Sequence, residues 1–323
     1  MAPSYRLIDY SIRPAKHAER RMLCEAFRRL SKFGAIEHYQ YVGFGAIWFA
    51  DFTLMHRALG IARMFCIERE VHHRERFEFN RPFGGVELMF GNSAQELPKI
   101  DWRNRTIAWL DYDDQLSPSI LADVRHIAGS ASSGSMLVVS VQAQTRPLQR
   151  TGDDDPPLEV ETVEQFRSVF GASRTPAEMA DSDLSGWKLA RLYRKVISDE
   201  IADGLSAANA GRGSGQRLKF KQVVSIEYAD GAKMTTIGGV FVDEGQEPIY
   251  SSCDFERLSF FRPSFESLRL EVPKLTPKEM REIERVLPQE NGNIVNVKPI
   301  PESDTRAFAS LYRYLPSFVS FEP

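Results

Sequence analysis

Residues 220–242 read FKQVVSIEYADGAKMTTIGGVFV, and this stretch decides the fold. Two runs rich in β-branched and aromatic residues flank the turn sequence ADGAK at 229–233. Two such runs joined by a short connection that contains Asp-Gly are typical of a β-hairpin. The stretch therefore predicts an antiparallel pair of strands late in the chain, and the kind of sheet that this pair joins depends on what comes before it.

Five apolar runs come before the hairpin and predict strands. They are continuous rather than alternating, as in parallel strands that are covered on both faces. Helical segments lie between several of them. Parallel strands with helical connections predict a doubly wound α/β sheet. The runs are EHYQYVGF ending at Gly43, ARMFCIE ending at Glu68, GVELMFGN ending near Asn92, RTIAWLDYD ending at Asp111 and SMLVVSVQAQ at 135–144.

Further segments flank or interrupt this sheet. Residues 1–35 form an N-terminal segment with eight Lys and Arg against three Asp and Glu, and they include an amphipathic helix at 17–32. The basic face of that helix is either solvated or a lid over an anionic ligand. The α/β domain spans 36–249, with a helical insertion at about 145–216. A C-terminal extension, 250–323, is expected to pack on the core or on a partner.

The composition limits the kind of protein. The chain has 323 residues, of which 42% are hydrophobic and 26% charged, as in ordinary globular proteins. Its net charge of −3 gives no general reason to expect nucleic acid. Three well-separated cysteines offer neither a metal-binding spacing nor a disulfide framework. With no signal peptide and no membrane-length apolar run, we expect a cytoplasmic protein with buried thiols and no membrane partner.

Small and polar residues follow the predicted strands where ligands bind in such a sheet, beyond the carboxyl ends. Gly43 and Gly45 would let the backbone approach a ligand closely, although many strand-to-helix turns need glycine only for geometry. Glu68 can accept hydrogen bonds from ribose hydroxyls, and its alternative is a surface acid. Asn92, with adjacent N–H groups, can bind a purine edge. Together these residues favour a nucleotide ligand.

The fourth strand ends in an acidic cluster, Asp111-Tyr112-Asp113-Asp114. Three acids at one strand end suit a cationic ligand, a metal ion or the acceptance of a proton. The alternative is that they cap the helix that follows Ser117-Pro118, because acids are favoured at helix N-termini.

With the late hairpin, this order of strands resembles that of class I S-adenosylmethionine-dependent methyltransferases. In that family, five parallel strands precede a hairpin that inserts one antiparallel strand into a Rossmann-like seven-stranded sheet. An NAD-binding sheet would instead continue with parallel strands. The resemblance covers residues 36–242. In the stretches RPAKHAERRMLCEAFRRL, YVGFGAIWFADF and WLDYDDQL, the chain is more closely similar to a bacterial family described as O-methyltransferases.

The resemblance implies S-adenosylmethionine as the cofactor and a role for each matching residue. A cationic sulfonium suits an acidic, partly aromatic surround. The turn against the methionine part of the cofactor would be formed by Gly43, Phe44, Gly45 and Ala46. Glu68 would bind the ribose hydroxyls, and Asn92 and Ser93 would lie near the adenine. Asp111 would face the sulfonium, with Tyr112 and Asp113 lining the substrate side.

The chain departs from the family pattern at several positions. Tyr41 stands where the usual motif has an acid, and Ile47 replaces the third glycine. The Asn/Asp-Pro-Pro-aromatic motif of amino methylases is absent, which favours an oxygen acceptor over a nitrogen acceptor. Gln142 and Gln144 follow the fifth strand where metal-dependent O-methyltransferases have acids, so no metal is expected.

Methyl transfer to oxygen requires that the acceptor lose its proton. Asp111 or Asp113 is the expected proton acceptor. Lys16 and Arg20, from the N-terminal helix, are expected to close the site. The alternative bases are four histidines: His17, His56, His72 and His73.

The sequence is therefore compatible with three functions. The expected one is methyl transfer from S-adenosylmethionine to an oxygen acceptor of unknown identity. The second is a non-catalytic or weakly catalytic scaffold, with a protein partner bound through the 145–216 insertion or the C-terminal extension. The third, a nucleic-acid methyltransferase, is opposed by the overall charge. Its support is the basic N-terminal helix and four residues of a later loop: Arg212, Arg217, Lys219 and Lys221.

Overall fold

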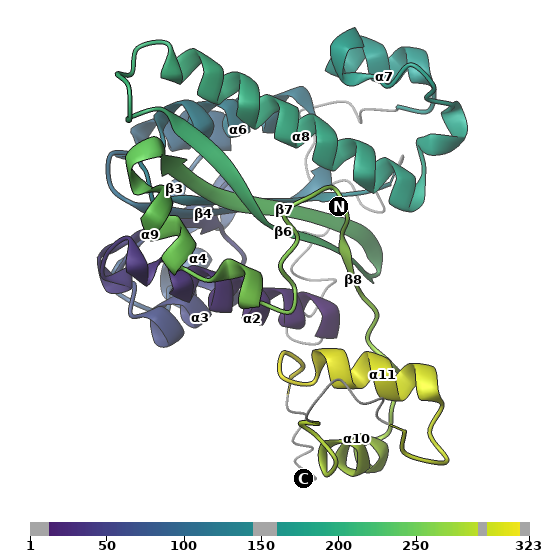
Figure 1. Ribbon diagram of the computed structural model, residues 1–323. Helices are drawn as coiled ribbons and strands as arrows, with labels where there is room; N and C mark the ends of the chain where they lie inside the picture. The colour runs from purple at the N-terminus through teal and green to yellow at the C-terminus, as the bar shows by residue number, and fades with distance from the viewer. Residues whose placement is uncertain (1–12, 145–159, 290–295, 317–323) are drawn as a thin grey trace.

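The computed structural model describes residues 13–144, 160–289 and 296–316 (Figure 1). Its strands form one sheet: β1 (Gln40–Phe44), β2 (Arg63–Glu68), β3 (Val86–Phe90), β4 (Thr106–Gln115), β5 (Met136–Gln142), β6 (Leu218–Asp230), β7 (Ala232–Asp243) and β8 (Leu268–Leu270). The strand order is β3-β2-β1-β4-β5-β7-β6-β8. The first five strands are parallel, and β7 enters antiparallel between β5 and β6. The doubly wound order and the inserted antiparallel strand are both confirmed.

The predicted hairpin is formed by β6 and β7, which pair across Gly231. Gly231 has a φ of 97°, a left-handed conformation that glycine adopts without steric cost. Two more glycines let β7 pack tightly between its neighbours. A Cβ on Gly239 would lie 2.4 Å from the Lys221 carbonyl oxygen, and one on Gly238 would lie 2.8 Å from Val138 Cγ2. The sequence thus places glycine where the adjacent strands leave no room for a side chain.

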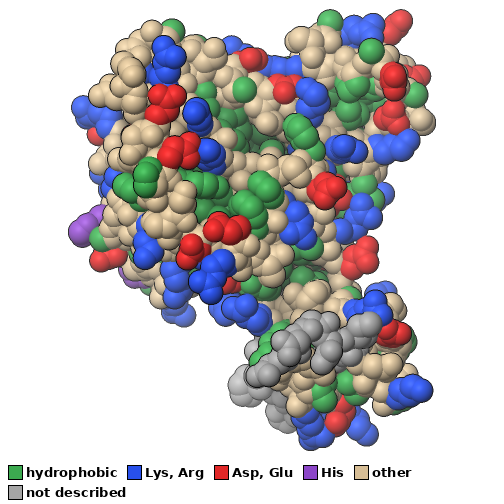
Figure 2. Space-filling model, in the orientation of Figure 1, with side chains coloured by type: hydrophobic (Ala, Val, Ile, Leu, Met, Phe, Trp, Pro, Cys, Tyr) green, Lys and Arg blue, Asp and Glu red, His purple; other side chains and the backbone are tan. Residues whose placement is uncertain are grey.

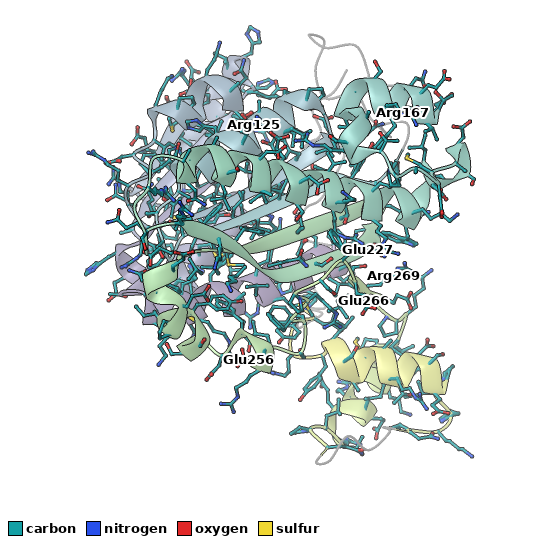
Figure 3. The ribbon with its side chains drawn as sticks, turned by 45° about the horizontal axis from the view of Figure 1, so that its top comes forward. Arg125, Arg167, Glu227, Glu256, Glu266 and Arg269 are labelled. Carbon is teal, nitrogen blue, oxygen red and sulfur yellow. The ribbon has the colours of Figure 1, made fainter. Side chains whose placement is uncertain are left out.

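The structure corrects the sheet prediction in two places. The sheet has eight strands rather than seven, because the three residues of β8 pair parallel to β6. Arg269 of β8 binds Glu227 of β6 at 3.1 Å (Figure 3), and Glu227 also accepts a hydrogen bond from the buried Arg194 at 2.7 Å. β4 does not end at Asp111 but continues to Gln115 through an irregularity in its pairing with β5.

Helices cover both faces of the sheet (Figure 1). They are α2 (Pro14–Arg29), α3 (Ala50–Leu59), α4 (Arg74–Asn80), α5 (Ser93–Glu96), α6 (Pro118–Ser130), α7 (Val163–Phe170), α8 (Gly186–Asn209), α9 (Glu247–Ser252), α10 (Pro277–Glu284) and α11 (Glu302–Leu311). Trp109 and Leu110 are adjacent on β4 and both fully buried, yet they belong to different apolar cores. Trp109 packs with α2 and α3, and Leu110 with α6 and α8, as a strand covered on both faces requires. Among the described residues, no helix has both the length and the apolarity of a membrane span.

The N-terminal helix packs on the same core as the sheet. It was predicted at 17–32, but α2 begins at Pro14, and a 3-10 turn, Leu30–Lys32, continues it. Proline is well suited to the first helical position, because its missing N–H would have no partner there. Met22 and Phe27 of the predicted apolar face are fully buried. The helix therefore reaches the carboxyl end of the sheet with its first two turns.

The insertion and the C-terminal extension are described in part. Residues 145–159 lie outside the described residues, and the rest of the insertion contains α7 and the long α8, which packs on α6, β6 and β7. Within the extension, β8 belongs to the sheet, whereas α10 and α11 lie beyond its edge at the bottom of Figure 1. The domain boundaries themselves stay predictions. The two helices share a small apolar cluster centred on Ile283, Ile300 and Phe308.

Candidate functional site

The turn after β1 lies where the strand order reverses, since β1 has β2 on one side and β4 on the other. A Cβ on Gly45 would lie 2.9 Å from Glu68 Oε2 and 3.0 Å from Cys66 Sγ. Only glycine lets the backbone pass so close to this carboxylate. Gly43 has a different neighbour, because its Cβ position lies 3.1 Å from the buried ring of Tyr41. Of the two predicted turn glycines, Gly45 therefore faces the predicted ribose-binding acid, and Gly43 makes room for packing.

Glu68 is the last residue of β2, and only 7% of it is exposed. Burial raises the pKa of its carboxyl to about 7, against the lowering effect of the hydrogen bond that Oε1 accepts from the Glu70 N–H at 2.8 Å. A desolvated carboxylate of this kind is stabilised by any further hydrogen-bond donor. The hydroxyl groups of a bound ligand would supply such donors.

A second polar cluster joins the ends of β3 and β4 to α6. Asn92 caps α5, accepting a hydrogen bond from the Gln95 N–H at 3.0 Å. The Ser93 hydroxyl and the Tyr112 hydroxyl both donate to the buried carboxylate of Asp123, the latter at 2.8 Å. The side chains of Asn92 and Ser93 thus already have protein partners at the predicted adenine position. Sequence reasoning missed Asp123, although an acid on the apolar face of LADVRHIA was a usable signal.

The acids of β4 do not cap the next helix, because the Ser117 side chain caps α6. Asp111 is half-buried and is held by Lys16. Desolvation by the surrounding protein raises the pKa of Asp113 to about 6, with repulsion from Asp111 adding to it. Asp113 as a residue nevertheless stays exposed, so its carboxyl is desolvated on one side and reachable on the other. A carboxyl of this kind can accept a proton near neutral pH, whereas the carboxylate of Asp111 is engaged by Lys16.

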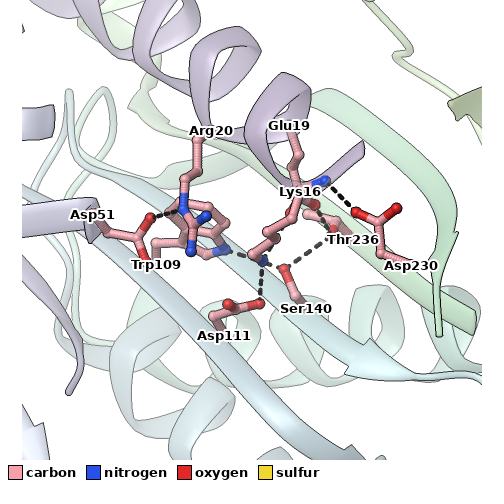
Figure 4. A network of polar contacts seen from close by, with 9 residues as sticks. All are labelled: Lys16, Glu19, Arg20, Asp51, Trp109, Asp111, Ser140, Asp230 and Thr236. Atoms are coloured by element: carbon pink, nitrogen blue, oxygen red, sulfur yellow. Dashed lines mark hydrogen bonds and ion pairs between the residues drawn. The ribbon is translucent and has the colours of Figure 1, made fainter. Parts of the chain in front are cut away.

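Helix α2 sets its basic side chains against these acids (Figure 4). Lys16 Nζ lies 2.6 Å from Asp111 Oδ1, and Arg20 Nε lies 2.5 Å from Asp51 Oδ1 at the start of α3. Lys16 and Arg20 are 4% and 8% exposed. The alternative of a solvated face is wrong for these two residues, because both are buried and both bind carboxylates of this chain. That they close the site over a ligand stays a prediction. The Arg21 and Arg28 side chains do lie exposed.

A buried chain of hydrogen bonds continues from Lys16 into the sheet (Figure 4). Its ammonium also binds Glu19 Oε2 at 2.8 Å, and Glu19 accepts a hydrogen bond from the Thr236 hydroxyl. Thr236 bonds the Ser140 hydroxyl at 2.8 Å, to which the Trp109 indole donates at 3.1 Å. Burial alone would lower the pKa of Lys16, but Asp111 and Glu19 outweigh it and raise that pKa. No local pattern in the sequence indicates this network, because its members come from α2, β4, β5 and β7.

The four histidines lie apart from these acids or are engaged elsewhere. His56 Nδ1 is 2.9 Å from the Ile61 carbonyl oxygen. Burial and the neighbouring arginines lower the pKa of His17 on α2. His72 and His73 belong to a 3-10 turn that follows Glu68 closely.

Across residues 13–144, 160–289 and 296–316, there is no group of three or more His, Cys, Asp or Glu side chains that could hold a metal ion. Gln142, which follows the fifth strand, donates through its side-chain amide to the Asp113 carbonyl oxygen. The cysteines are free and buried, as predicted: Cys24, Cys66 and Cys253.

A hollow beside the glycine turn has a cavity volume of about 20 Å³. Binding sites for small molecules usually measure about 300–1,000 Å³, so this hollow is small for a cofactor. The rings of Phe44 and Tyr112 stand 4.7 Å apart between the ends of β1 and β4 and help to fill this region. The hollow is lined by Arg20, Phe44, Ala46, Trp48, Phe49, Ala50, Asp51 and Phe52.

Comparison with known proteins identifies the family to which this chain is similar. A family model described as "Putative O-methyltransferase" matches residues 8–323. No curated protein matches the chain. Among solved structures, the chain is similar to the O-methyltransferase TomG from Streptomyces achromogenes, in complex with SAM, with 15% identity over 72% of this chain and 90% of TomG and a TM-score of 0.37.

An O-methyltransferase structure from Klebsiella pneumoniae is similar at 13% identity over 73% of this chain and 92% of that one, with a TM-score of 0.34. These two likenesses are distant and add nothing to the strand order described above. The family match, in contrast, spans nearly the whole sequence, including the turn, the acids of β4 and helix α2. The chain belongs to this family of O-methyltransferases, as the resemblance predicted.

Proposed function

We propose that this protein transfers a methyl group from S-adenosylmethionine to an oxygen atom of its acceptor. The observation that carries the proposal is the cradle at the switch point of the sheet, where Gly45 passes within contact of the Glu68 carboxylate. A side chain at position 45 would fill this cradle. The donor set fits the cofactor, because a carboxylate suits ribose hydroxyls and Asp111 at the neighbouring strand suits a cation.

S-Adenosylmethionine would supply a methyl group on a cationic sulfonium that is electrophilic without further activation. The protein has to hold this group and the acceptor in line. Glu68 would hold the ribose, and the backbone from Gly43 to Ala46 would leave space for the methionine part. Phe44 and Tyr112 offer aromatic faces, which attract a cation and exclude water. Asn92 and Ser93 would contribute backbone groups near the adenine, because their side chains bind protein.

Proton removal from the acceptor falls to Asp113 in this proposal. Its pKa of about 6 leaves it mostly ionised at neutral pH, yet close enough to neutrality to accept a proton readily. Asp111 is less suited, because its Oδ1 accepts from the Lys16 ammonium at 2.6 Å. We assign Asp111 to charge balance at the methyl donor and Asp113 to the proton of the acceptor hydroxyl.

Binding also requires the site to widen. The hollow at the turn is smaller than usual ligand sites, and the first two turns of α2 cover it, with Arg20 among its lining residues. The C-terminal half of α2 is fixed by fully buried residues such as Phe27. The first half is held by the ion pairs of Lys16 and Arg20, which would close the site from the α2 side, so widening is expected in the turn itself, where Trp48 is exposed.

The other two functions have less support. Lys219 and Lys221 were predicted in a loop, but both lie on β6, where they are 3.7 Å from Glu244 and 2.9 Å from Glu247. Figure 2 shows acidic and basic side chains interspersed on the visible face rather than a single basic patch. A nucleic acid is thus a less favoured acceptor. If no cofactor binds, the protein would instead be a scaffold without turnover, with protein partners at the insertion or the C-terminal extension.

Calorimetric titration with S-adenosylmethionine and S-adenosylhomocysteine tests the proposal. We expect binding by the wild-type protein and a loss of about 10–100-fold in Glu68→Ala, because hydrogen bonds to a buried carboxylate are strong. Glu87→Ala, an exposed acid on the adjacent strand, is the matched control and should bind normally. Absence of binding by the folded wild-type protein would leave a methyltransferase-like scaffold. Equal binding by both variants would remove Glu68 from the site.

A further inference from the structure

Lys16 is a fixed part of the site rather than a surface lysine that can swing away. Its backbone N–H donates to Asp230 Oδ2 at 2.8 Å, at the tip of the hairpin. Its ammonium lies 4.5 Å from the centre of the Trp109 ring, between the carboxylates of Asp111 and Glu19 (Figure 4). A residue that is 4% exposed, with its backbone held by one group and its side chain by three, stays in place when a small ligand arrives.

The charges around Lys16 decide what ligand the nearby acid can attract. Asp111 and Glu19 carry two negative charges when ionised, and Lys16 cancels one of them. Asp111 is the member that reaches the ligand side, since it is half-buried while Glu19 is fully buried. A cation that approaches Asp111 therefore meets the ammonium of Lys16 on the same carboxylate. A neutral ligand of the same shape meets no such repulsion.

We propose that Lys16 sets the charge selectivity of the cofactor site, by competing with a cationic ligand for Asp111. This inference rests on the proposed function. S-Adenosylmethionine and S-adenosylhomocysteine differ by one methyl group and one positive charge. Lys16 weakens binding of the charged methyl donor relative to the neutral product.

The readout is the ratio of two dissociation constants, that of S-adenosylmethionine divided by that of S-adenosylhomocysteine, measured by calorimetry. In Lys16→Met the ratio should fall roughly tenfold, because a unit charge a few ångströms away is only partly screened at a half-buried site. Sinefungin, in which a protonated amine replaces the sulfonium, should follow the charged donor. Lys16→Arg keeps the charge and should keep the ratio within about twofold. Arg21→Met removes an exposed charge from the same helix and is the matched control.

Removal of Lys16 leaves Glu19 buried without its cation, so Lys16→Met needs a partner variant. The double variant Lys16→Met with Glu19→Gln removes both charges, and its folding is checked by circular dichroism and thermal melting. A smaller fall in the ratio is expected there, because loss of the Glu19 charge also removes some attraction for the cation. An unchanged ratio in a folded variant that binds both ligands overturns the role of Lys16 and leaves the proposed function standing. A wild-type protein that binds neither ligand overturns both.

Discussion

Replacement of Gly45 by alanine tests the cradle most directly. The added methyl group would lie 2.9 Å from Glu68 Oε2, 3.0 Å from Cys66 Sγ and 3.3 Å from Glu68 Cβ. The turn cannot shift easily, because the Gly45 N–H donates to a carbonyl of β2 at 2.8 Å. The carboxylate must move instead, although it is largely buried and bound to the Glu70 N–H. Overpacking of this kind costs about 1–3 kcal/mol of unfolding free energy.

The same displacement should weaken cofactor binding. A carboxylate that is pushed from its position loses its hydrogen bonds to the ribose, each of which contributes about 1.5–3 kcal/mol when one partner is charged. We therefore expect Gly45→Ala to raise the dissociation constant of S-adenosylhomocysteine by about 10–100-fold. Gly84→Ala is the matched control, since a Cβ at Gly84 has no atom within 4 Å. It should leave both stability and affinity nearly unchanged.

A double-mutant cycle separates the cradle from a general disturbance of the turn. Glu68→Ala removes the oxygen that the new methyl group would meet, so Gly45→Ala should cost less stability and no further affinity in that background. Denaturant unfolding and calorimetry of the four proteins measure both effects. If Gly45→Ala costs the same with and without the Glu68 carboxylate, the two residues do not act together and the assigned ribose site is wrong.

Three other changes follow from the charges. Asp113→Asn should abolish most turnover, while its affinity for S-adenosylhomocysteine should stay within about twofold of wild type. The rate of the wild-type protein should rise with pH through about 6, and a flat pH–rate profile would exclude Asp113 as the base. Glu68→Gln should stabilise the protein by up to about 3 kcal/mol at pH 8 but not at pH 4. The reason is that a carboxyl pKa raised from 4.5 to about 7 makes the wild-type protein lose stability as the pH rises through that range. Equal gains in stability in thermal melts at both pH values would contradict this. Glu227→Gln should lower the free energy of unfolding by about 3–5 kcal/mol, because it leaves Arg194 buried without its carboxylate. Asp101→Asn, which removes an ion pair at the surface, is the control and should change it very little. Urea unfolding of the three proteins measures both effects.

The sheet was predictable because each of its signals is local. Continuous apolar runs predicted β1 to β5, and the Asp-Gly turn predicted β6 and β7. The three residues of β8 give no such signal, because a run of that length is too short for any periodicity. β8 pairs where Arg269 meets Glu227, two residues that lie far apart in the sequence. The extension of β4 to Gln115 was hidden for another reason, since its polar residues read as a loop.

The site was predictable only where a strand end fixed it. Glu68 and Asp111 could be singled out as candidates because the carboxyl ends of parallel strands lie at one edge of the sheet. Asp123 was missed because its partners, Ser93 and Tyr112, reach it from two other elements. The buried state of Lys16 was missed because its helix looks like an ordinary amphipathic helix with a charged face. Helical spacing says which residues share a face, but the partner of that face comes from the tertiary fold.

The burial of Lys16 and Arg20 also explains why one charge on a ligand matters at this site. Partly buried ion pairs are costly to break when a charge is left alone, so the first turns of α2 do not leave their acids readily. Lys16 therefore stays beside Asp111 when a ligand binds, and Arg20 stays beside Asp51. A cationic ligand has to share the Asp111 carboxylate with the Lys16 ammonium, whereas a neutral ligand does not. Lys16→Met should therefore strengthen binding of the cation and leave binding of the neutral ligand nearly unchanged.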